Sequence, residues 1–359
     1  MSFENYIRNE DTITAPCILV TLGPSSLSRE VVNRITAENI YLLRINLSHT
    51  PLEKVEETIT SIQRWTDVPV CLDSEGAQIR NQAMTHENVE FVQGARIKIH
   101  YADVIGDAEN ISFTPRSIAK EFVIGDRIRV DFNSVCFKVI EKHQDHCLAV
   151  VEQGGIVASN KAADMDRGLP LVPITEKDKK AIEIGKKMGI RHFALSFANC
   201  REDVDRMRAL AGEDAVIISK IESRSGLINL NSIITASDQI IVDRGDLSRQ
   251  IAVEKIPFLQ RRIISQARAM NTPVFIATNL LETMVTTKNP TRAEANDVAS
   301  TLLMGANGLV LAAETAIGGY PVEAVEMIGK LIDQYSRWTP NTNIAELLAN
   351  GADPELRLN

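Results

Sequence analysis

The segment Ala215–Ser223 joins an apolar run to a lysine and a glutamate. Its sequence is AVIISKIES, in which residues 216–218 precede Lys220 and Glu222. A run of β-branched residues predicts a strand that is buried on both faces, as in a parallel sheet. Residues two apart on a strand point to the same face, so Lys220 and Glu222 would share one end of that sheet. They could serve a metal-assisted reaction on an anion or form a structural ion pair, and this segment alone leaves both open.

Polar residues at the ends of other apolar segments extend this set. Glu222 and Asp246, from neighbouring strands, suit Mg²⁺ or Mn²⁺, because such ions are usually held by one or two carboxylates with substrate oxygens and water. Arg44 and Lys220 would complement an anionic, phosphorylated substrate. Gly245 opens a turn whose amides could bind a carboxylate. The set predicts phosphoryl transfer or enolate stabilisation.

These residues require a scaffold that gathers strand ends. Eight short apolar segments end in polar residues and alternate with amphipathic helical patterns, which predicts an α/β fold of the TIM (β/α)₈ barrel class with its site at the carboxyl ends of the strands. The predicted strands are Cys17–Gly23, Tyr41–His49, Val68–Gly76, His192–Ala198, Ala215–Ser223, Gln239–Leu247, Pro273–Leu281 and Gly308–Ala316. The predicted helices include Ser28–Ala37, Pro51–Trp65, Glu176–Met188, Glu254–Met270 and Arg292–Met304.

A long interruption follows the third predicted strand. Helical periodicity is replaced there by period-two patterns at residues 96–99, 128–132, 136–140 and 148–151, separated by glycine-containing turns. A connection of this length must be a domain of its own, and we expect a small β-barrel that acts as a lid. The predicted division is residues 1–80 and 168–340 for the large barrel, 81–167 for the inserted lid and 341–359 for a C-terminal tail.

Bulk composition narrows the possible partners. The 359 residues carry a formal net charge of −8, which argues against nucleic-acid or anionic-membrane binding. No apolar run approaches the roughly 18 residues of a membrane helix, and the N-terminus lacks a signal-peptide core. The five cysteines are scattered. We therefore expect a cytoplasmic protein with reduced thiols.

With these motifs in place, the sequence resembles the pyruvate kinase family from about residue 17 to residue 335. The resemblance implies a glycolytic kinase that converts phosphoenolpyruvate and ADP to pyruvate and ATP with Mg²⁺. The matching motifs are ILVTLGPSS, LLRINLSH, CLDSEGAQIR, ISKIES, IIVDRGDL, IATNLLETM, NPTRAEANDVAS and LAAETAIGGYPVEAVEMI.

The resemblance also implies individual roles. Glu222 and Asp246 would hold the divalent metal, while Lys220 and Arg44 would act on the phosphoryl group. Thr278 and the amides of Gly245 and Asp246 would bind the substrate carboxylate, with Thr278 near the proton path to the enolate carbon. A monovalent-cation site would comprise Asn46, Ser48, Asp73 and Ser74, and the nucleotide would face His49, Arg80 and Lys161.

Several positions depart from the family pattern. Gln78 replaces the acidic residue linked with potassium use, which argues against the K⁺ site. The family has a small residue bordering the pyruvate moiety where this chain has Asp243, so a carboxylate there would repel an anionic substrate, bring a further charge to the metal or select another substrate. The family continues into a C-terminal effector domain, whereas this sequence stops at Asn359, so effector control of the usual kind is not expected.

Two alternatives to a kinase remain open at this point. The first is an Mg²⁺-dependent aldolase or lyase that stabilises a pyruvate-type enolate without nucleotide, which the altered lid and Asp243 would suit. The second is a catalytically retired homologue with a binding or regulatory role, against which the retained Lys220 and Glu222 argue. In each case we expect a small-molecule acid as ligand and a homo-oligomer.

Overall fold

The computed structural model describes residues 15–349, except residues 77, 117, 132, 133, 166, 168 and 170. The chain divides into two compact units. The first comprises Met1–Leu43, Ile62–Val68 and Phe275–Asn359, and the second comprises Arg44–Ser61 and Pro69–Val274.

Within the described residues, eight parallel strands close into a barrel in the order β1-β17-β16-β15-β14-β13-β3-β2. Most of their residues are buried, which explains the β-branched runs that the sequence places in them. The predicted TIM barrel is confirmed. The strands are β1 (Cys17–Leu22), β2 (Ile40–Asn46), β3 (Val70–Asp73), β13 (His192–Leu195), β14 (Val216–Ile221), β15 (Gln239–Asp243), β16 (Val274–Ala277) and β17 (Gly308–Leu311).

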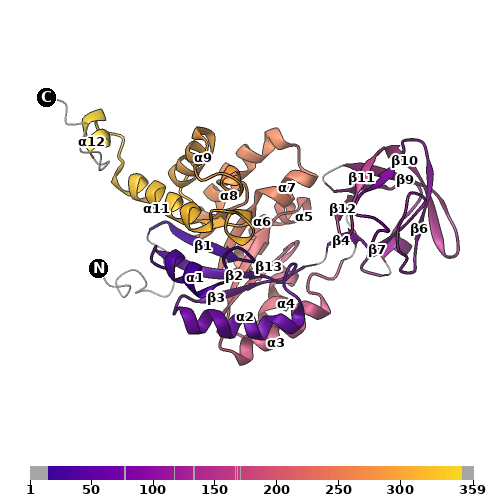
Figure 1. Ribbon diagram of the computed structural model, residues 1–359, viewed down its shortest axis with the longest axis horizontal. Helices are drawn as coiled ribbons and strands as arrows, with labels where there is room; N and C mark the ends of the chain where they lie inside the picture. Colours follow the sequence, from indigo (N-terminus) through magenta and orange to yellow (C-terminus); the bar gives the residue numbers. More distant parts are fainter. Residues whose placement is uncertain are drawn as a thin grey trace. The chain divides into compact units, whose positions relative to one another are not determined.

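Helices follow the barrel strands, and the five predicted ones are present with ends within two residues of those expected. In the first unit, α11 packs against α1 and α9 (Figure 1). The helices are α1 (Arg29–Ile35), α2 (Leu52–Trp65), α3 (Glu176–Lys187), α4 (Arg201–Ala211), α5 (Arg224–Ile228), α6 (Leu230–Ala236), α7 (Arg244–Gln250), α8 (Ile256–Ala269), α9 (Arg292–Leu303), α10 (Ala313–Ala316), α11 (Pro321–Arg337) and α12 (Ile344–Ala349).

Two barrel strands are shorter than the sequence pattern predicts, because a helix begins inside each predicted range. The eighth strand, predicted through Ala316, ends at Leu311, and Ala313–Ala316 form α10. The sixth strand, predicted through Leu247, ends as β15 at Asp243, and α7 begins at Arg244. The reason is local, because the Asp243 side chain accepts a hydrogen bond from the Asp246 amide and so acts as the N-cap of a helix. Asp246 therefore lies on a helix rather than on a strand.

The inserted segment forms a second closed barrel, with strand order β10-β6-β7-β4-β12-β8-β9, beside a two-stranded sheet of β11 and β5 (Figure 1). Its own apolar core includes Phe91, Phe113, Phe122 and Phe137. The predicted β-barrel inserted after barrel strand β3 is confirmed, whereas the exact domain limits and the lid role stay predictions. The strands are β4 (Ile79–Asn81), β5 (Val89–Phe91), β6 (Arg96–His100), β7 (Asn110–Thr114), β8 (Arg127–Val130), β9 (Val135–Lys142), β10 (His146–Gln153), β11 (Gly155–Val157) and β12 (Ala162–Met165).

Three further observations bear on the predictions from composition. Across the described part of the chain, no helix has the length and apolar character needed to cross a bilayer. All five cysteines lie in described residues and are free thiols. Of the predicted tail, α12 covers part, and residues 350–359 lie outside the described residues.

His192, at the start of β13, gives a prediction for acid stability. Burial, assisted by the charge of Arg191, lowers the pKa of His192 to about 4. In the unfolded chain the imidazole of His192 takes up a proton near pH 6.5, whereas in the folded chain it stays neutral down to about pH 4. Because the unfolded state binds the extra proton, this residue makes the free energy of unfolding fall as pH drops from about 7 to 4. Replacing His192 by Gln should reduce that fall by roughly 3 kcal/mol, as measured by urea unfolding at several pH values. An unchanged pH dependence would contradict this assignment.

Candidate active site

Lys220 lies on β14 at the centre of a group of carboxylates. Its Nζ is 3.0 Å from Glu222 Oε2, 3.7 Å from Asp73 Oδ2 and 3.8 Å from Asp243 Oδ2. Burial alone would lower the pKa of Lys220, but the charges of Asp73, Glu222 and Asp243 together raise it well above its usual value. Lys220 is therefore a permanent ammonium ion, and it shares one end of the sheet with Glu222 as its spacing predicts.

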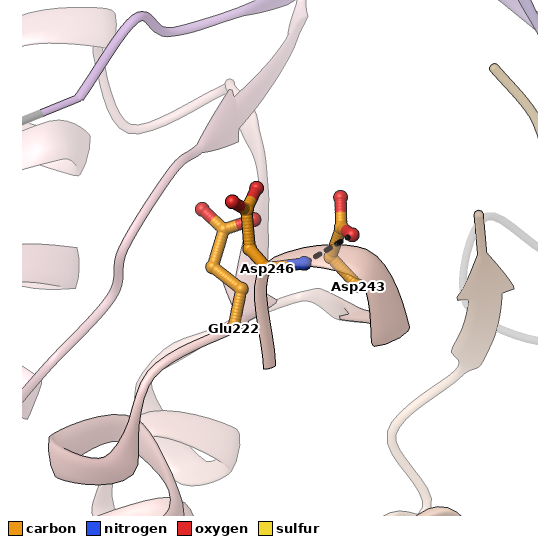
Figure 2. A group of neighbouring side chains, drawn as sticks. All are labelled: Glu222, Asp243 and Asp246. Atoms are coloured by element: carbon orange, nitrogen blue, oxygen red, sulfur yellow. Dashed lines mark hydrogen bonds between the residues drawn. The ribbon is translucent and has the colours of Figure 1, made fainter. Parts of the chain in front are cut away.

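Two of these acids, Glu222 and Asp243, come together with Asp246 as a candidate metal centre. Ligand oxygens of Glu222, Asp243 and Asp246 all lie within 4.8 Å of one another. Glu222 follows β14, Asp243 ends β15 and Asp246 lies in the first turn of α7. Figure 2 shows the Glu222 and Asp246 carboxylates side by side, with Asp243 next to them and accepting from the Asp246 amide at 3.4 Å.

The two carboxylate oxygens of the fully buried Glu222 differ in their hydrogen bonding. Its Oε1 accepts the Phe197 N–H at 2.6 Å, but its Oε2 accepts no hydrogen bond from the described residues. Burial raises the pKa of Glu222, and the charges of Asp246 and Asp243 raise it further, although Lys220 opposes them. Burial and Asp243 likewise raise the pKa of Asp246. A cation placed between these carboxylates would relieve their repulsion.

The donor set fits a hard divalent cation. Carboxylate oxygens are the ligands preferred by Mg²⁺ and Mn²⁺, and nitrogen or sulfur donors are absent from this cluster of Glu222, Asp243 and Asp246. Glu222 Oε2 has the charge of Lys220 beside it at 3.0 Å but accepts no hydrogen bond from the described residues, so it offers an acceptor that such an ion would satisfy.

Two further residues belong to the surroundings of Lys220: Ser196 contacts it directly, and Arg44 contacts its neighbour Asp73. Arg44 on β2 donates to Asp73 Oδ2 at 2.9 Å, and both side chains are buried. Ser196 Oγ lies 3.2 Å from Lys220 Nζ and 2.7 Å from the Ser74 carbonyl. Sequence reasoning missed Ser196 as a site residue, although its place directly after β13 was a usable signal.

Arg249 is a second residue that sequence reasoning missed. It donates to Asp246 Oδ1 at 2.9 Å and, through two nitrogens, to Asp164 Oδ2 at 2.6 and 2.8 Å. Asp164 belongs to β12 of the inserted barrel. The only available signal was the i, i+3 spacing from Asp246, which becomes informative only once α7 is known to be a helix.

Of the predicted monovalent-site residues, Asn46 and Ser48 contact each other, whereas Ser74 and Asp73 contact residues outside the set. Asn46 Oδ1 accepts the Ser48 amide at 2.9 Å, while Ser74 Oγ accepts the Ser196 amide at 2.9 Å. Asp73 is engaged by Arg44. The assignment of Asn46, Ser48, Asp73 and Ser74 to a cation stays a prediction.

Among the predicted nucleotide-facing residues, His49 lies in a positive environment. Burial lowers the pKa of His49, and the charges of Arg80, Lys177 and Arg44 lower it further. Arg80 donates to the Asn160 carbonyl at 3.0 Å, and the adjacent Lys161 has its Nζ 3.2 Å from Asp131 Oδ2. Strand pairing explains the proximity of Arg80 and Lys161, because β4 and β12 are antiparallel neighbours.

A cavity of about 520 Å³ adjoins Arg249. Arg129, Asp164 and Arg224 also line it, together with apolar residues such as Met165 and Leu171, so its wall is mixed in character. His49, Arg80 and Lys161 are not among its lining residues, so their proposed contact with a nucleotide does not rest on this cavity.

The predicted carboxylate-binding residues lie in separate units. Thr278 follows β16 in the first unit with a φ of 67°, and its hydroxyl donates to the Ala277 carbonyl at 2.6 Å. Positive φ is costly for a β-branched residue and clusters at functional sites. Gly245 lies in the first turn of α7 in the second unit, where the next amide, that of Asp246, donates to Asp243.

A closed parallel barrel whose strand ends gather charged side chains is the arrangement of (β/α)₈ enzymes. The family model for the pyruvate kinase barrel domain matches residues 14–325. The chain belongs to the pyruvate kinase family, as the sequence resemblance indicated.

Individual relatives agree with the family match. The chain is 32% identical over 323 residues to a pyruvate kinase of Thermotoga maritima, covering 88% of this chain and 69% of that protein. It is 31% identical to a pyruvate kinase of Methylorubrum extorquens, covering 94% and 72%. For a pyruvate kinase of Bacillus licheniformis the identity is 33%, covering 86% of this chain and 55% of the relative.

The turn that supports Ser196 gives a stability prediction. Gly76 has a φ of +71°, and a Cβ added there would lie 2.8 Å from the Ser196 Cβ. Replacing Gly76 by Ala should lower the free energy of unfolding by about 2 to 4 kcal/mol, because a strained backbone is combined with a steric clash.

Gly189→Ala is the matched control for Gly76→Ala. Gly189 has a similar φ of +77°, but a Cβ there would meet no atom within 4 Å. In urea unfolding, Gly189→Ala should therefore lower the free energy of unfolding by only about 1 kcal/mol, which is the cost of the strained backbone alone. An equal decrease in the free energy of unfolding in the two variants would show that a Cβ at position 76 does not clash with Ser196.

Proposed function

We propose that this chain is a pyruvate-kinase-like phosphotransferase that acts on phosphoenolpyruvate and a nucleoside diphosphate with Mg²⁺. The observation that carries the proposal is the buried Lys220 ammonium, 3.0 Å from Glu222, beside a cluster of carboxylates suited to a divalent cation. Phosphoryl transfer needs fixed positive charge around the moving group more than it needs covalent chemistry by the protein.

Lys220 supplies permanent positive charge to this chemistry. Because it is buried at the strand ends, its charge is little screened and needs no reorganisation as negative charge develops on the substrate. Mg²⁺ held by Glu222 and Asp246 would supply further charge stabilisation of the phosphoryl and enolate oxygens. Arg44, oriented by its 2.9 Å contact with Asp73, contacts the phosphate.

The remaining roles concern orientation and proton transfer. The Gly245 amide and Thr278 bind the substrate carboxylate, whereas the Asp246 amide, which the sequence assigns to the same role, donates to Asp243. The Thr278 hydroxyl lies on the proton path to the enolate carbon. His49, Arg80 and Lys161 face the nucleotide, a role supported by the cationic surroundings of His49.

The two alternative functions are not favoured. The relatives named above are pyruvate kinases, and neither a lyase nor a retired homologue is among them. The use of nucleotide, Mg²⁺ and K⁺, the homo-oligomer and the cytoplasmic location stay predictions.

A coupled assay tests the proposal directly. Purified protein with phosphoenolpyruvate, ADP and Mg²⁺ should release pyruvate only when nucleotide is present, in buffers that contain either K⁺ or Na⁺. Absence of pyruvate release with every nucleoside diphosphate and both monovalent ions would overturn the proposal. Carbon–carbon bond cleavage or formation without nucleotide would instead support the lyase alternative.

Removing the central ammonium should abolish most of the activity. Lys220→Met should lower kcat by about 10²–10³-fold, the range seen when one preorganised charge-stabilising donor is removed. Lys187→Met is the control, because Lys187 is an exposed helix residue paired with Glu183. Equal activity of the two variants would contradict the role of Lys220.

A further inference from the structure

The charged groups around Lys220 form a connected network with an excess of negative charge. Arg44 contacts Asp73, Lys220 contacts Asp73, Glu222 and Asp243, and Arg249 contacts Asp164 and Asp246. With every carboxylate ionised, the five carboxylates of these ion pairs outnumber the three cationic groups by two negative charges. Such an excess is costly in a buried place unless a cation compensates it.

Two independent observations indicate where a compensating cation would bind. The oxygens of Glu222, Asp243 and Asp246 converge within 4.8 Å, and Glu222 Oε2 is buried without a hydrogen bond from the described residues. Buried polar atoms are nearly always satisfied. A divalent cation at this point would complete the contacts of Glu222 and neutralise the network.

We propose that Asp243 is a third carboxylate ligand of the divalent cation, so that this chain binds the ion before any organic substrate arrives. The inference rests on the metal site of the proposed function and deepens it. Without a carboxylate at position 243 the same network would carry one excess negative charge, and Asp243 brings that excess to the two that a divalent cation carries.

A structural role for Asp243 must be separated from this one. The side chain accepts the Asp246 amide at 3.4 Å and so caps α7. Ser caps a helix start about as well as Asp does, but its short neutral side chain brings no negative charge to the ion. Asp243→Ser therefore keeps the cap and removes the third carboxylate.

The test measures Mn²⁺ binding to the substrate-free protein by electron paramagnetic resonance. Wild-type protein should bind one Mn²⁺, with Mg²⁺ competing, and Asp243→Ser should weaken the affinity at least tenfold, because the carboxylate lost is a direct ligand. Asp203→Asn is the matched control, because Asp203 is a buried acid in the first turn of α4 that contacts the Asn199 amide. This control should bind Mn²⁺ as wild type does.

The outcomes separate this inference from the proposed function. An unchanged Mn²⁺ affinity in Asp243→Ser, or no Mn²⁺ binding by wild-type protein without substrate, overturns the inference even if phosphoenolpyruvate is turned over. A selective loss supports it even if no kinase activity is found. Thermal unfolding in EDTA checks that each variant is folded. If Asp243→Ser is unfolded, Asp243→Asn takes its place, because Asn also caps a helix and carries no charge. The Mn²⁺ affinity of Asp243→Asn then tests the inference in the same way.

Discussion

The site depends on one buried ammonium held among carboxylates. Lys220 is 6% exposed and lies within 4 Å of three acidic side chains. Neither sign of charge is stable alone at such depth, because desolvation penalises each ion that has no partner. Lys220 and the acids therefore require one another, and the excess of acids leaves room for a further cation.

The barrel makes this arrangement possible. Parallel strands β13, β14 and β15 are neighbours in register, so residues at their carboxyl ends meet without any long-range matching of loops. The buried strands fix the backbone, and the first residues beyond them carry the polar groups. The turns are equally constrained, since Asp178 of α3 accepts the amides of Glu75 and Gly76 and so holds the turn next to Ser196.

Much of the barrel and part of the site can be predicted from the sequence. The features that could not be predicted have physical causes. The β-branched runs and their polar ends predicted eight strands, and the same-face spacing brought Lys220 and Glu222 together. The start of α7 was missed because Asp243 reads equally as a strand end and as a helix cap. Arg249 and Ser196 were missed because their roles are set by tertiary contacts, which periodicity does not encode.

The central claim is that Glu222 and its neighbours hold a divalent cation opposite Lys220. The most direct measurement is a calorimetric titration of Mg²⁺ into Glu222→Gln, which removes the charge with little change of shape, alongside turnover of the same variant. The account predicts that affinity falls at least tenfold and that turnover falls with it. Wild-type Mg²⁺ affinity together with wild-type turnover in this variant would contradict it.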